Sequence, residues 1–577
     1  MGHAADAHAL YVGDWLVEAA LCRMSGGGRA LHVRPRLIDL LVYLASNPGR
    51  VIGKDELLEH VWRGEFVVES VLARSVADLR QILGDDATTP RFIETIPKRG
   101  YRLIAPVKWA ADRVRRDGPS IAVLPFSDLS AGGGQQYFCD GLVEELTTTL
   151  AGIPGLRVIA RTSAFAFRDR PVDVREIGRQ LDVRTVLEGA VQRAADRVRV
   201  TVQAIDTSDG SHIWSRRFDR LAANVFAIQD EIAQAVAAEL EVEPRDGSDA
   251  ALARRRTTDT AADELYLRGR HILERRTAPA LAAAAEYFGR AIEHDPGHAP
   301  AHAGLAICHE NLAFLGYVAP GDGYPKATAA AKRAVQLDPA LAEPHAVLGL
   351  GLSVYAWQWA EAERALRRAI DLGPSYALAH MAYSNVLAAM GRSREAFTEA
   401  ELAQDLDPLS PLARVVLAMR LGEARRFEDA LEHLRATLAM NPEFGTVHLH
   451  VGRTCCMLGR YDEAEHHLRQ APAGFPLAIG LLGHVLARRG RRAEADEVLR
   501  QLAQLSTERY VGAFPVALVH QGLGDLDTAL DWYTKAFDAH EGILMVAIVD
   551  PVTELLRNDP RFAPLVARMK LPPAVQS

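Results

Sequence analysis

Cysteine is scarce in this chain of 577 residues, and its pattern excludes two kinds of site. The five cysteines are scattered, and no two of them form the CxxC spacing that binds zinc or exchanges disulfides. Cys455 and Cys456 are adjacent, which leaves a redox sensor open. The Ala/Gly/Leu-rich helical stretch around them favours cysteine as a small apolar residue. We therefore expect reduced cysteines in a cytoplasmic protein.

Long apolar runs and catalytic signatures are also missing. The first residues, MGHAADAHALYVGDW, contain no basic segment followed by an apolar one, and no run of about 18 apolar residues is present to cross a bilayer. HExxH, GxSxG and metal-spaced groups of His and Cys are likewise absent. We expect a protein with no membrane contact, no enzymatic activity, no cofactor and no metal.

The remaining composition is that of a folded chain, with 49% hydrophobic and 24% charged residues. At roughly 100 to 200 residues per domain, this length predicts several domains. The net charge of -8 excludes a uniformly basic nucleic-acid-binding surface, although a small DNA-binding module fits within an acidic whole.

Residues 1–108 predict a winged helix-turn-helix domain of the α+β class. Alternating apolar runs at the start indicate small antiparallel strands. Helical periodicity then predicts three helices, which begin at Pro35, Lys54 and Glu69. The closing run RFIETIPKRGYRLIAPV has two β-rich segments and indicates a hairpin with a basic tip. Strands, three helices and a hairpin follow one another in the winged-helix order, and residues 109–118 read as a linker.

The third of these helices, residues 69–83, is the expected recognition helix. Its apolar stripe consists of Leu72, Val76, Leu79 and Leu83. The opposite side, which is left for a DNA groove, carries Ser70, Ala73, Arg74, Ala77, Asp78 and Gln81. Arg74 is the first choice for base readout, because a guanidinium can pair with guanine O6 and N7.

Phosphate contacts are expected from outside that face. Arg80 beside it and Lys54 near the start of the second helix are candidates to reach phosphates, which position a protein without reading sequence. In the hairpin, Thr95, Lys98 and Arg99 are candidates for the DNA backbone or the minor groove. For any single arginine, the alternative is an ordinary solvated surface charge.

The first 106 residues or so resemble the carboxy-terminal DNA-binding domain of OmpR/PhoB-type response regulators. The resemblance is carried by VGDWLVEAA, PRLIDLLVYLASNPGRVIGKDELLEHVW, VLARSVADLRQILGDD and FIETIPKRGYRLIAPV. It implies a phosphorelay-like output domain, here at the start of the chain, as in CadC-like one-component regulators. The groove and wing contacts that it implies fall on Arg74, Asp78, Arg80, Thr95, Pro97, Lys98 and Arg99.

Residues 119–243 predict a central α/β domain. SIAVLPF, LRVIAR and three later runs indicate strands, and helices are expected near 137–150 and 174–181. Glu144 and Glu145 read as ordinary charge on a helix surface. The run from IAVLPFSDLS to DGSHIWSRRFDR resembles the TolB-amino-terminal-like domain, which implies an architecture more than an activity.

Residues 260–577, after a linker at 244–259, predict an α-solenoid of tetratricopeptide repeats. Pro374, Pro408, Pro442 and Pro476 lie 34 residues apart, the length of that repeat. Small or apolar residues fall where the two helices of one unit need to approach closely, at Tyr383, Ser384, Leu387, Ala396, Ala400 and Ala403. We expect about six to eight units, whose stacking leaves a continuous concave surface that binds protein segments.

The leading hypothesis is a cytoplasmic one-component transcriptional regulator that binds double-stranded promoter DNA through its winged helix. The repeats or the central domain would receive a protein partner or an effector, with RNA polymerase as one candidate. Residues 1–106 hold thirteen Lys and Arg against thirteen Asp and Glu, so one copy should bind modestly and a homodimer would help. This balance and Asp78 also prompt the alternative, a protein-protein interaction scaffold with a degenerate DNA-binding domain. A third hypothesis is a regulatory partner of a nucleotide cyclase.

Overall fold

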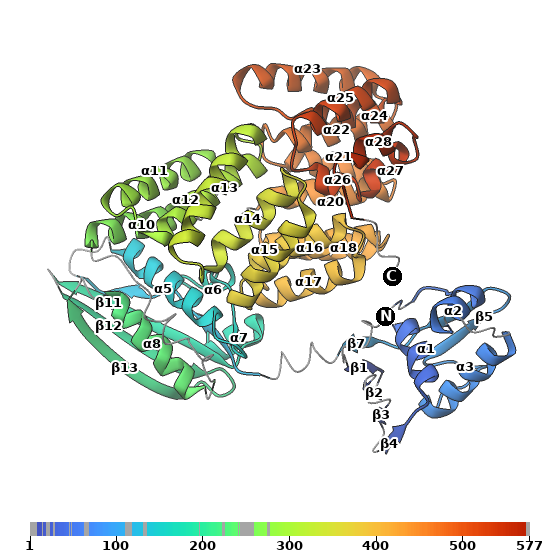
Figure 1. The fold of residues 1–577 in the computed structure, drawn as a ribbon, viewed down its shortest axis with the longest axis horizontal. Helices are drawn as coiled ribbons and strands as arrows, with labels where there is room; N and C mark the ends of the chain where they lie inside the picture. Colours follow the sequence, from blue (N-terminus) through green and yellow to red (C-terminus); the bar gives the residue numbers. More distant parts are fainter. Residues whose placement is uncertain are drawn as a thin grey trace. The chain divides into compact units, whose positions relative to one another are not determined.

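The computed structural model describes residues 9–13, 15–18, 23–26, 29–45, 47, 49–62, 69–109, 118–130, 135–194, 197–221, 225–240, 242, 259–273, 277–442 and 444–572. The chain divides into two compact units, Met1–Gly118 and Pro119–Ser577 (Figure 1).

The first unit contains two antiparallel sheets and three helices. The larger sheet has the strand order β4-β3-β2-β1-β7, and the smaller one is the hairpin β5-β6. The strands are β1 (Ala9–Val12), β2 (Trp15–Glu18), β3 (Arg23–Gly26), β4 (Arg29–His32), β5 (Ile93–Ile96), β6 (Gly100–Leu103) and β7 (Val107–Trp109). The helices are α1 (Pro35–Ala45), α2 (Lys54–Val61) and α3 (Glu69–Leu83). This arrangement confirms the winged-helix prediction.

The three helices share one apolar core, because each presents a buried stripe to the others. The predicted stripe of α3 is at most 4% exposed at Leu72, Val76, Leu79 and Leu83. The stripe of α1 is as deeply buried at Leu37, Leu40, Leu41 and Leu44. Burying a leucine side chain fully is worth about 1.5–3 kcal/mol. These residues therefore fix which side of α3 faces outward.

The hairpin β5-β6 is held at its base by an isolated bridge between Ile52 and Tyr101. Ile52 N donates to Tyr101 O at 2.8 Å, and Tyr101 N donates to Ile52 O at 3.0 Å. This close approach requires glycine at position 100, because a Cβ there would lie 1.8 Å from Ile52 O. Gly100 also has a φ of 142°, a backbone conformation that favours glycine. The bridge sets where the turn at residues 97–99 projects.

The second unit begins with a mixed sheet of order β10-β8-β11-β12-β13, with β9 beside β11. β8, β9, β10 and β11 pair in parallel, whereas β12 is antiparallel to both of its neighbours. The strands are β8 (Ser120–Val123), β9 (Ser127–Asp128), β10 (Arg157–Val158), β11 (Thr185–Ala194), β12 (Arg197–Asp206) and β13 (His212–Leu221). The helices are α5 (Gln136–Ala151), α6 (Arg161–Phe165), α7 (Val174–Leu181) and α8 (Val225–Glu239). The sequence did not predict α8, which packs against α5, β12 and β13.

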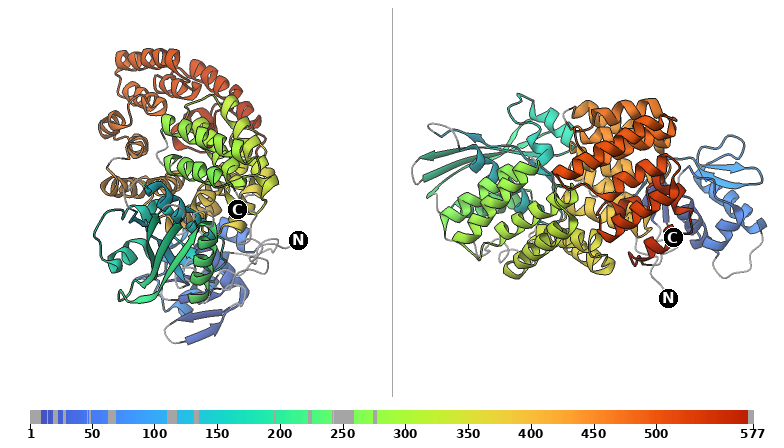
Figure 2. Two further views of the ribbon diagram at one scale, coloured as in Figure 1. Left: turned by 90° about the vertical axis from the view of Figure 1, so that its left-hand side faces the viewer. Right: turned by 90° about the horizontal axis from the view of Figure 1, so that it is seen from above.

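Helix pairs follow and stack into a curved array (Figure 2). The first four pairs are α10 (Thr260–Leu273) with α11 (Ala278–His294), α12 (Ala299–Phe314) with α13 (Pro320–Leu337), α14 (Ala342–Val354) with α15 (Trp359–Leu372), and α16 (Ala377–Ala389) with α17 (Ser393–Leu406). The next four are α18 (Pro411–Glu423) with α19 (Phe427–Met440), α20 (Thr446–Met457) with α21 (Tyr461–Gln470), α22 (Pro476–Arg488) with α23 (Arg492–Glu508), and α24 (Ala513–Gly522) with α25 (Leu526–Asp538).

Close packing within a pair occurs where small residues were predicted. The six positions are at most 5% exposed: Tyr383, Ser384, Leu387, Ala396, Ala400 and Ala403. Pro374, Pro408 and Pro442 each follow the second helix of a pair. Pro476 keeps the 34-residue spacing but begins α22 instead, while α21 already ends at Gln470. Proline is suited to the first turn of a helix, because its missing N–H has no partner there.

Buried ion pairs join the central segment to the repeats. Arg270 of α10 donates through Nη1 to Glu343 Oε1 at 2.7 Å and pairs through Nη2 with Glu144 of α5. Arg161 Nε lies 3.0 Å from Glu144 Oε2. The interpretation of Glu144 as ordinary surface charge is wrong, because its partner Arg270 comes from a distant helix that no local pattern places beside it.

The end of the chain packs against the first helices of the repeat pairs. α26 (Leu544–Ala547) contacts α14 and α16, and the 3-10 turn Pro551–Thr553 contacts α20. Trp359 Nε1 donates to Met569 O at 2.6 Å, and Arg453 pairs with Asp550. The last helices are α27 (Glu554–Arg557) and α28 (Phe562–Ala567), shown in red in Figure 1. Over these helices, the face that we expected to be open to protein segments is covered by the chain itself.

Deleting residues 544–577 should destabilise the repeats, because buried Leu544, Met545, Ile548 and Val552 would be removed and their neighbours exposed. We expect the melting temperature to fall by roughly 5 °C or more and a hydrophobic dye to bind. Differential scanning fluorimetry and dye fluorescence measure both. Trp359→Phe, which removes the hydrogen bond to Met569 O and part of one buried ring system, is the control and should shift melting less than the deletion. An unchanged melting temperature after the deletion would contradict this packing.

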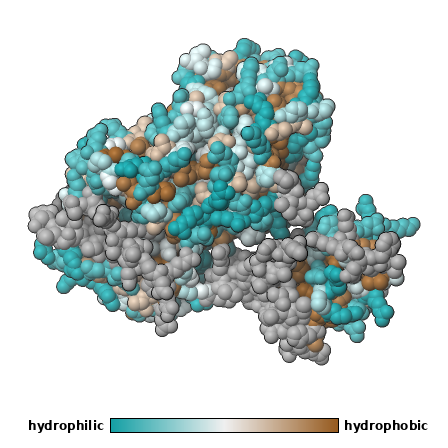
Figure 3. Space-filling view, viewed as in Figure 1, coloured by the Kyte–Doolittle hydropathy of each residue, from teal (hydrophilic) through white to brown (hydrophobic). Residues whose placement is uncertain are grey.

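Most of the coloured residues on the face drawn in Figure 3 are hydrophilic, and apolar residues form small separate groups over the repeat helices. Among the described residues, no helix is both long and apolar enough to cross a membrane.

Candidate nucleic-acid interface

The outward side of α3 carries the residues that the sequence predicted for DNA contact. Five of them are exposed: Ser70, Ala73, Arg74, Ala77 and Gln81. Arg74 is the long cationic side chain among them, with Ala73 and Ala77 as small neighbours. Small neighbours allow a helix to approach base edges closely, so this face has the shape and the donor that major-groove readout requires.

Asp78 on the same helix is paired with Arg34, which directly precedes α1. The Arg34 side chain is 72% exposed and the Asp78 side chain 30% exposed. The pair compensates the negative charge on the predicted DNA face and brings a second arginine to its edge. Arg34 was missed in the sequence because it lies 44 positions from Asp78, and the only signal was its place just before a helix.

Arg80 is turned into the domain. Its Nη2 donates to Ile93 O at 2.6 Å and to Thr95 Oγ1 at 2.9 Å, and its side chain is only 12% exposed. The structure thus brings two predicted contact residues, Arg80 and Thr95, into contact with each other. In this position the guanidinium ties α3 to β5 and orients the hairpin.

Asp85, just after the end of α3, binds the backbone at the start of the hairpin. Its carboxylate accepts hydrogen bonds from the backbone N–H of Arg91 at 2.6 Å, Phe92 at 3.1 Å and Ile93 at 2.8 Å. The Asp85 side chain is fully buried. Charge-assisted hydrogen bonds of this kind are stronger than neutral ones. They fix the position of β5 relative to the end of α3.

The tip of the hairpin is basic and exposed. Pro97, Lys98 and Arg99 are all exposed, and Lys98 has a φ of 62° in the turn. Lower on the strands, Arg102 Nε donates to Glu94 Oε2 at 2.9 Å, which stabilises the paired strands. Two cations therefore project from a rigid base on a different element from Arg74.

Lys54 begins α2 and is partly buried. The helix carries Asp55 and Glu56 in its first turn, and Glu56 is bound by Arg50 Nη2 at 3.0 Å and by Tyr43 Oη at 3.1 Å. Lys54 thus lies on a different helix from Arg74, directly after Gly53, which is beside the hairpin turn because a Cβ on Gly53 would lie 3.9 Å from Arg99 O. At this helix start a phosphate would meet backbone N–H groups.

The other candidate chemistries gain no support from the described residues. They contain no group of three or more His, Cys, Asp or Glu arranged to hold a metal ion. Cys455 and Cys456 are buried, and burial raises the pKa of both thiols to about 12. A thiol with such a pKa holds its proton at neutral pH and is a poor redox sensor.

Native Cys455 and Cys456 should therefore resist thiol reagents up to about pH 9, because thiolate forms only as the pH approaches the raised pKa. In a Cys22→Ala variant, Ellman's reagent should react at least about 100-fold more slowly with folded protein than with protein in urea. The reason is that the reagent reacts with thiolate, and burial lowers the fraction of each thiol that is deprotonated. Fast reaction of a native thiol that peptide mass spectrometry traces to Cys455 or Cys456, and not to Cys139 or Cys308, would revive the sensor. Cys22 is removed because it lies outside the described residues.

Comparison with known proteins agrees with this geometry. Residues 28–103 match the family described as transcriptional regulatory protein, C terminal, and residues 354–411 and 423–477 match tetratricopeptide repeats. The chain therefore consists of a winged-helix DNA-binding domain, a segment built on a mixed sheet, and a helical array of tetratricopeptide type.

Three relatives show how far the similarity reaches. A Rhizobium meliloti (strain 1021) protein whose name designates an adenylate cyclase is 38% identical over 240 residues, 41% of this chain and 40% of the relative. The transcriptional activator CadC of Escherichia coli (strain K12) is 44% identical over 102 residues, 18% of this chain and 20% of CadC. The transcriptional regulator HilA of Salmonella typhi is 24% identical over 393 residues, 67% of this chain and 68% of HilA. The chain thus spans less than half the length of the first two relatives.

Proposed function

We propose that this protein is a one-component transcriptional regulator that binds promoter DNA through α3 and the hairpin β5-β6. The observation that carries the proposal is the outward side of α3, where Arg74 stands between small residues on a helix whose other side is core. The family match of residues 28–103 and the activator and regulator names of two relatives support it.

The long and polar side chains among the predicted contact residues have distinct roles in this proposal. Arg74 reads a base in the major groove, while Lys98 and Arg99 contact backbone phosphates or the minor groove. Ser70, Gln81 and Lys54 add polar contacts at the rim. Arg80 and Thr95 contribute indirectly, because the hydrogen bond between them positions the hairpin relative to α3.

Selection from a random duplex library tests the proposal. Full-length protein should enrich one sequence motif at low salt, and a motif with two half-sites would add evidence for a homodimer. A library that stays random after several rounds, at every salt concentration tried, would contradict DNA recognition.

We propose domain boundaries at residues 1–108 for the winged helix, 119–243 for a central domain of TolB-amino-terminal-like type, and 260–577 for the repeats. The linkers fall at 109–118 and 244–259. Most of their residues, 110–117 and 244–258, lie outside the described residues. The break between two compact units after residue 118 supports the first boundary.

The repeats are proposed to bind a protein partner, with RNA polymerase as a candidate, in the cytoplasm where promoter DNA is reached. Because the last residues cover the first helices of several pairs, a partner either binds the outer helices or displaces that segment. No enzymatic activity is part of this proposal.

Two other functions were considered for this architecture. The scaffold alternative drew on Asp78, but its pairing with Arg34 compensates the charge and favours DNA binding. Regulation of a nucleotide cyclase is a second candidate, since one relative bears a cyclase name over 240 matched residues. Co-purification of a cyclase with the tagged protein would support that candidate, and its absence from the purified complex would count against it.

A further inference from the structure

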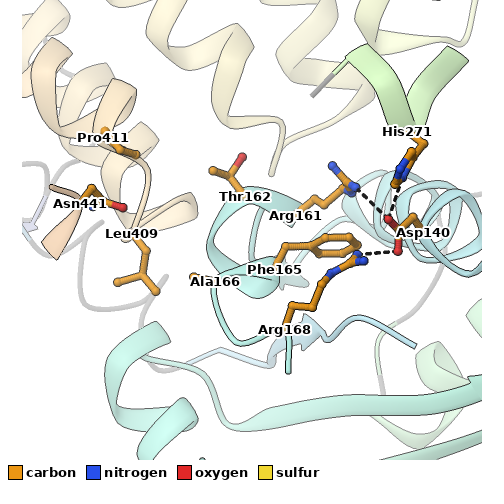
Figure 4. Close-up of a pocket in the computed structure, with 10 residues that line it drawn as sticks. All are labelled: Asp140, Arg161, Thr162, Phe165, Ala166, Arg168, His271, Leu409, Pro411 and Asn441. Atoms are coloured by element: carbon orange, nitrogen blue, oxygen red, sulfur yellow. Dashed lines mark hydrogen bonds and ion pairs between the residues drawn. The ribbon is translucent and has the colours of Figure 1, made fainter. Parts of the chain in front are cut away.

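A cavity of about 460 Å³ lies where the central segment meets the repeat array. One side comes from α5, α6, the turn after α6 and the end of α10. The other comes from the loop before α18, the first residue of α18 and the residue after α19. Figure 4 shows its ten lining residues, Asp140, Arg161, Thr162, Phe165, Ala166, Arg168, His271, Leu409, Pro411 and Asn441. Its size falls within the range of about 300–1,000 Å³ that small-molecule sites occupy.

Asp140 organises the polar end of the cavity. Its side chain is 2% exposed and accepts from Arg168 Nη2 at 2.5 Å, with His271 Nδ1 at 2.9 Å (Figure 4). It also accepts from Gln136 Nε2 at 2.8 Å. Burial alone would raise the pKa of Asp140, but hydrogen bonds from His271, Gln136 and Arg168 outweigh it and lower that pKa. Asp140 is therefore an ionised anchor that orients the arginine and the imidazole.

Two guanidinium groups are fixed beside this anchor. Phe165 lies between them, with its ring centroid 3.9 Å from Arg161 Cζ and 4.8 Å from Arg168 Cζ (Figure 4). Arg161 is engaged by Glu144 at 3.0 Å. Arg168 lines the cavity, is 28% exposed and donates to Asp140 through Nη2; within the described part of the chain, its Nε and Nη1 have no hydrogen-bond partner. Arg161 is compensated by Glu144 and also lies 3.9 Å from Asp140, so Arg168 is the arginine that is left to meet a ligand.

The opposite wall is apolar and held in place. Leu409 and Pro411 line it, with the Asn441 amide beside them (Figure 4). Hydrogen bonds across the junction fix this wall, because Leu409 N donates to Ser163 Oγ at 2.8 Å and Ser163 Oγ donates to Asp407 Oδ1 at 2.5 Å. The site is thus preformed, with a cationic end and an apolar side.

We propose that this cavity binds a small organic carboxylate. The carboxylate group pairs with Arg168, since guanidinium and carboxylate match in charge and geometry. The apolar body of the ligand lies against Leu409 and Pro411. All lining residues belong to the second compact unit, whereas the residues proposed to contact DNA belong to the first, so the site goes beyond the proposed function.

Isothermal titration calorimetry on the full-length protein tests the site with hexanoate, octanoate, 4-phenylbutyrate and the neutral 4-phenylbutanamide. At least one carboxylate should bind saturably below about 1 mM, and the amide at least about 10-fold more weakly than its acid, as expected for loss of a charge-assisted bond. Arg168→Gln should weaken carboxylate binding by a similar factor. Arg170→Gln is the matched control, because Arg170 is exposed two residues away and does not line the cavity.

The comparison of acid with amide uses the unaltered protein and does not depend on the variants folding. No saturable carboxylate binding up to about 10 mM would overturn the proposal. Equal binding of acid and amide would overturn it too, as would equal effects of the Arg168 and Arg170 substitutions.

Discussion

Replacing Arg74 by alanine should reduce affinity for the selected DNA motif by roughly 10- to 100-fold, as expected for the loss of one bidentate base contact. Because Arg74 is exposed, the substitution should leave folding intact. Affinity for random duplex should fall much less, so the variant should lose discrimination. Fluorescence anisotropy on motif and random duplexes measures both affinities.

The hairpin tip should respond differently. Lys98→Ala with Arg99→Ala should weaken binding to both duplexes and reduce the slope of log affinity against log salt by about 2, because each phosphate contact releases about one counterion. Arg91→Ala is the matched control: it removes an exposed arginine at the opposite end of β5. If Arg91→Ala weakens binding and lowers the salt slope as much as the double substitution does, the hairpin tip makes no particular phosphate contact.

Gly100→Ala should destabilise the winged-helix domain by roughly 3 kcal/mol or more, which is large for one methyl group. The new Cβ would lie 1.8 Å from Ile52 O and 2.8 Å from Ile52 C, and the φ of 142° would be strained. The bridge from Ile52 to Tyr101 would have to open, which also frees the hairpin. Urea denaturation of residues 1–118, followed by tryptophan fluorescence, measures the loss.

Gly84→Ala separates the clash of a new Cβ with neighbouring atoms from the backbone strain of a positive φ. Gly84 also has a positive φ, of 68°, but a Cβ there meets nothing within 4 Å. It should therefore cost only the backbone strain, about 1–2 kcal/mol. Equal losses for both variants would mean that the contact with Ile52 contributes little.

Local periodicity was enough to predict the three helices and the inward side of α3. Leu72, Val76 and Leu79 recur at helical spacing, and a helix with one apolar stripe has one way to pack on a core. The outward position of Arg74 follows from the same pattern. The close approach of small residues such as Ala396 and Ala400 followed from repeat spacing in the same way.

Partners that are distant in sequence were not predictable in this way. Arg80 looked like a phosphate ligand, and only the folded hairpin places Ile93 O within 2.6 Å of it. Arg34 directly precedes α1 and Asp78 lies within α3, so their pairing depends on how α1 packs against α3. The return of the chain end to Trp359 spans 210 positions and has no local signal.

The most direct test of the central claim is anisotropy of the full-length protein on its selected motif and on random duplex, with a salt titration. The account predicts tighter binding to the motif, lost on Arg74→Ala, and affinity for both duplexes that falls linearly as the logarithm of salt rises. Equal affinity for the two duplexes, unchanged by Arg74→Ala, would contradict a DNA-reading role for α3.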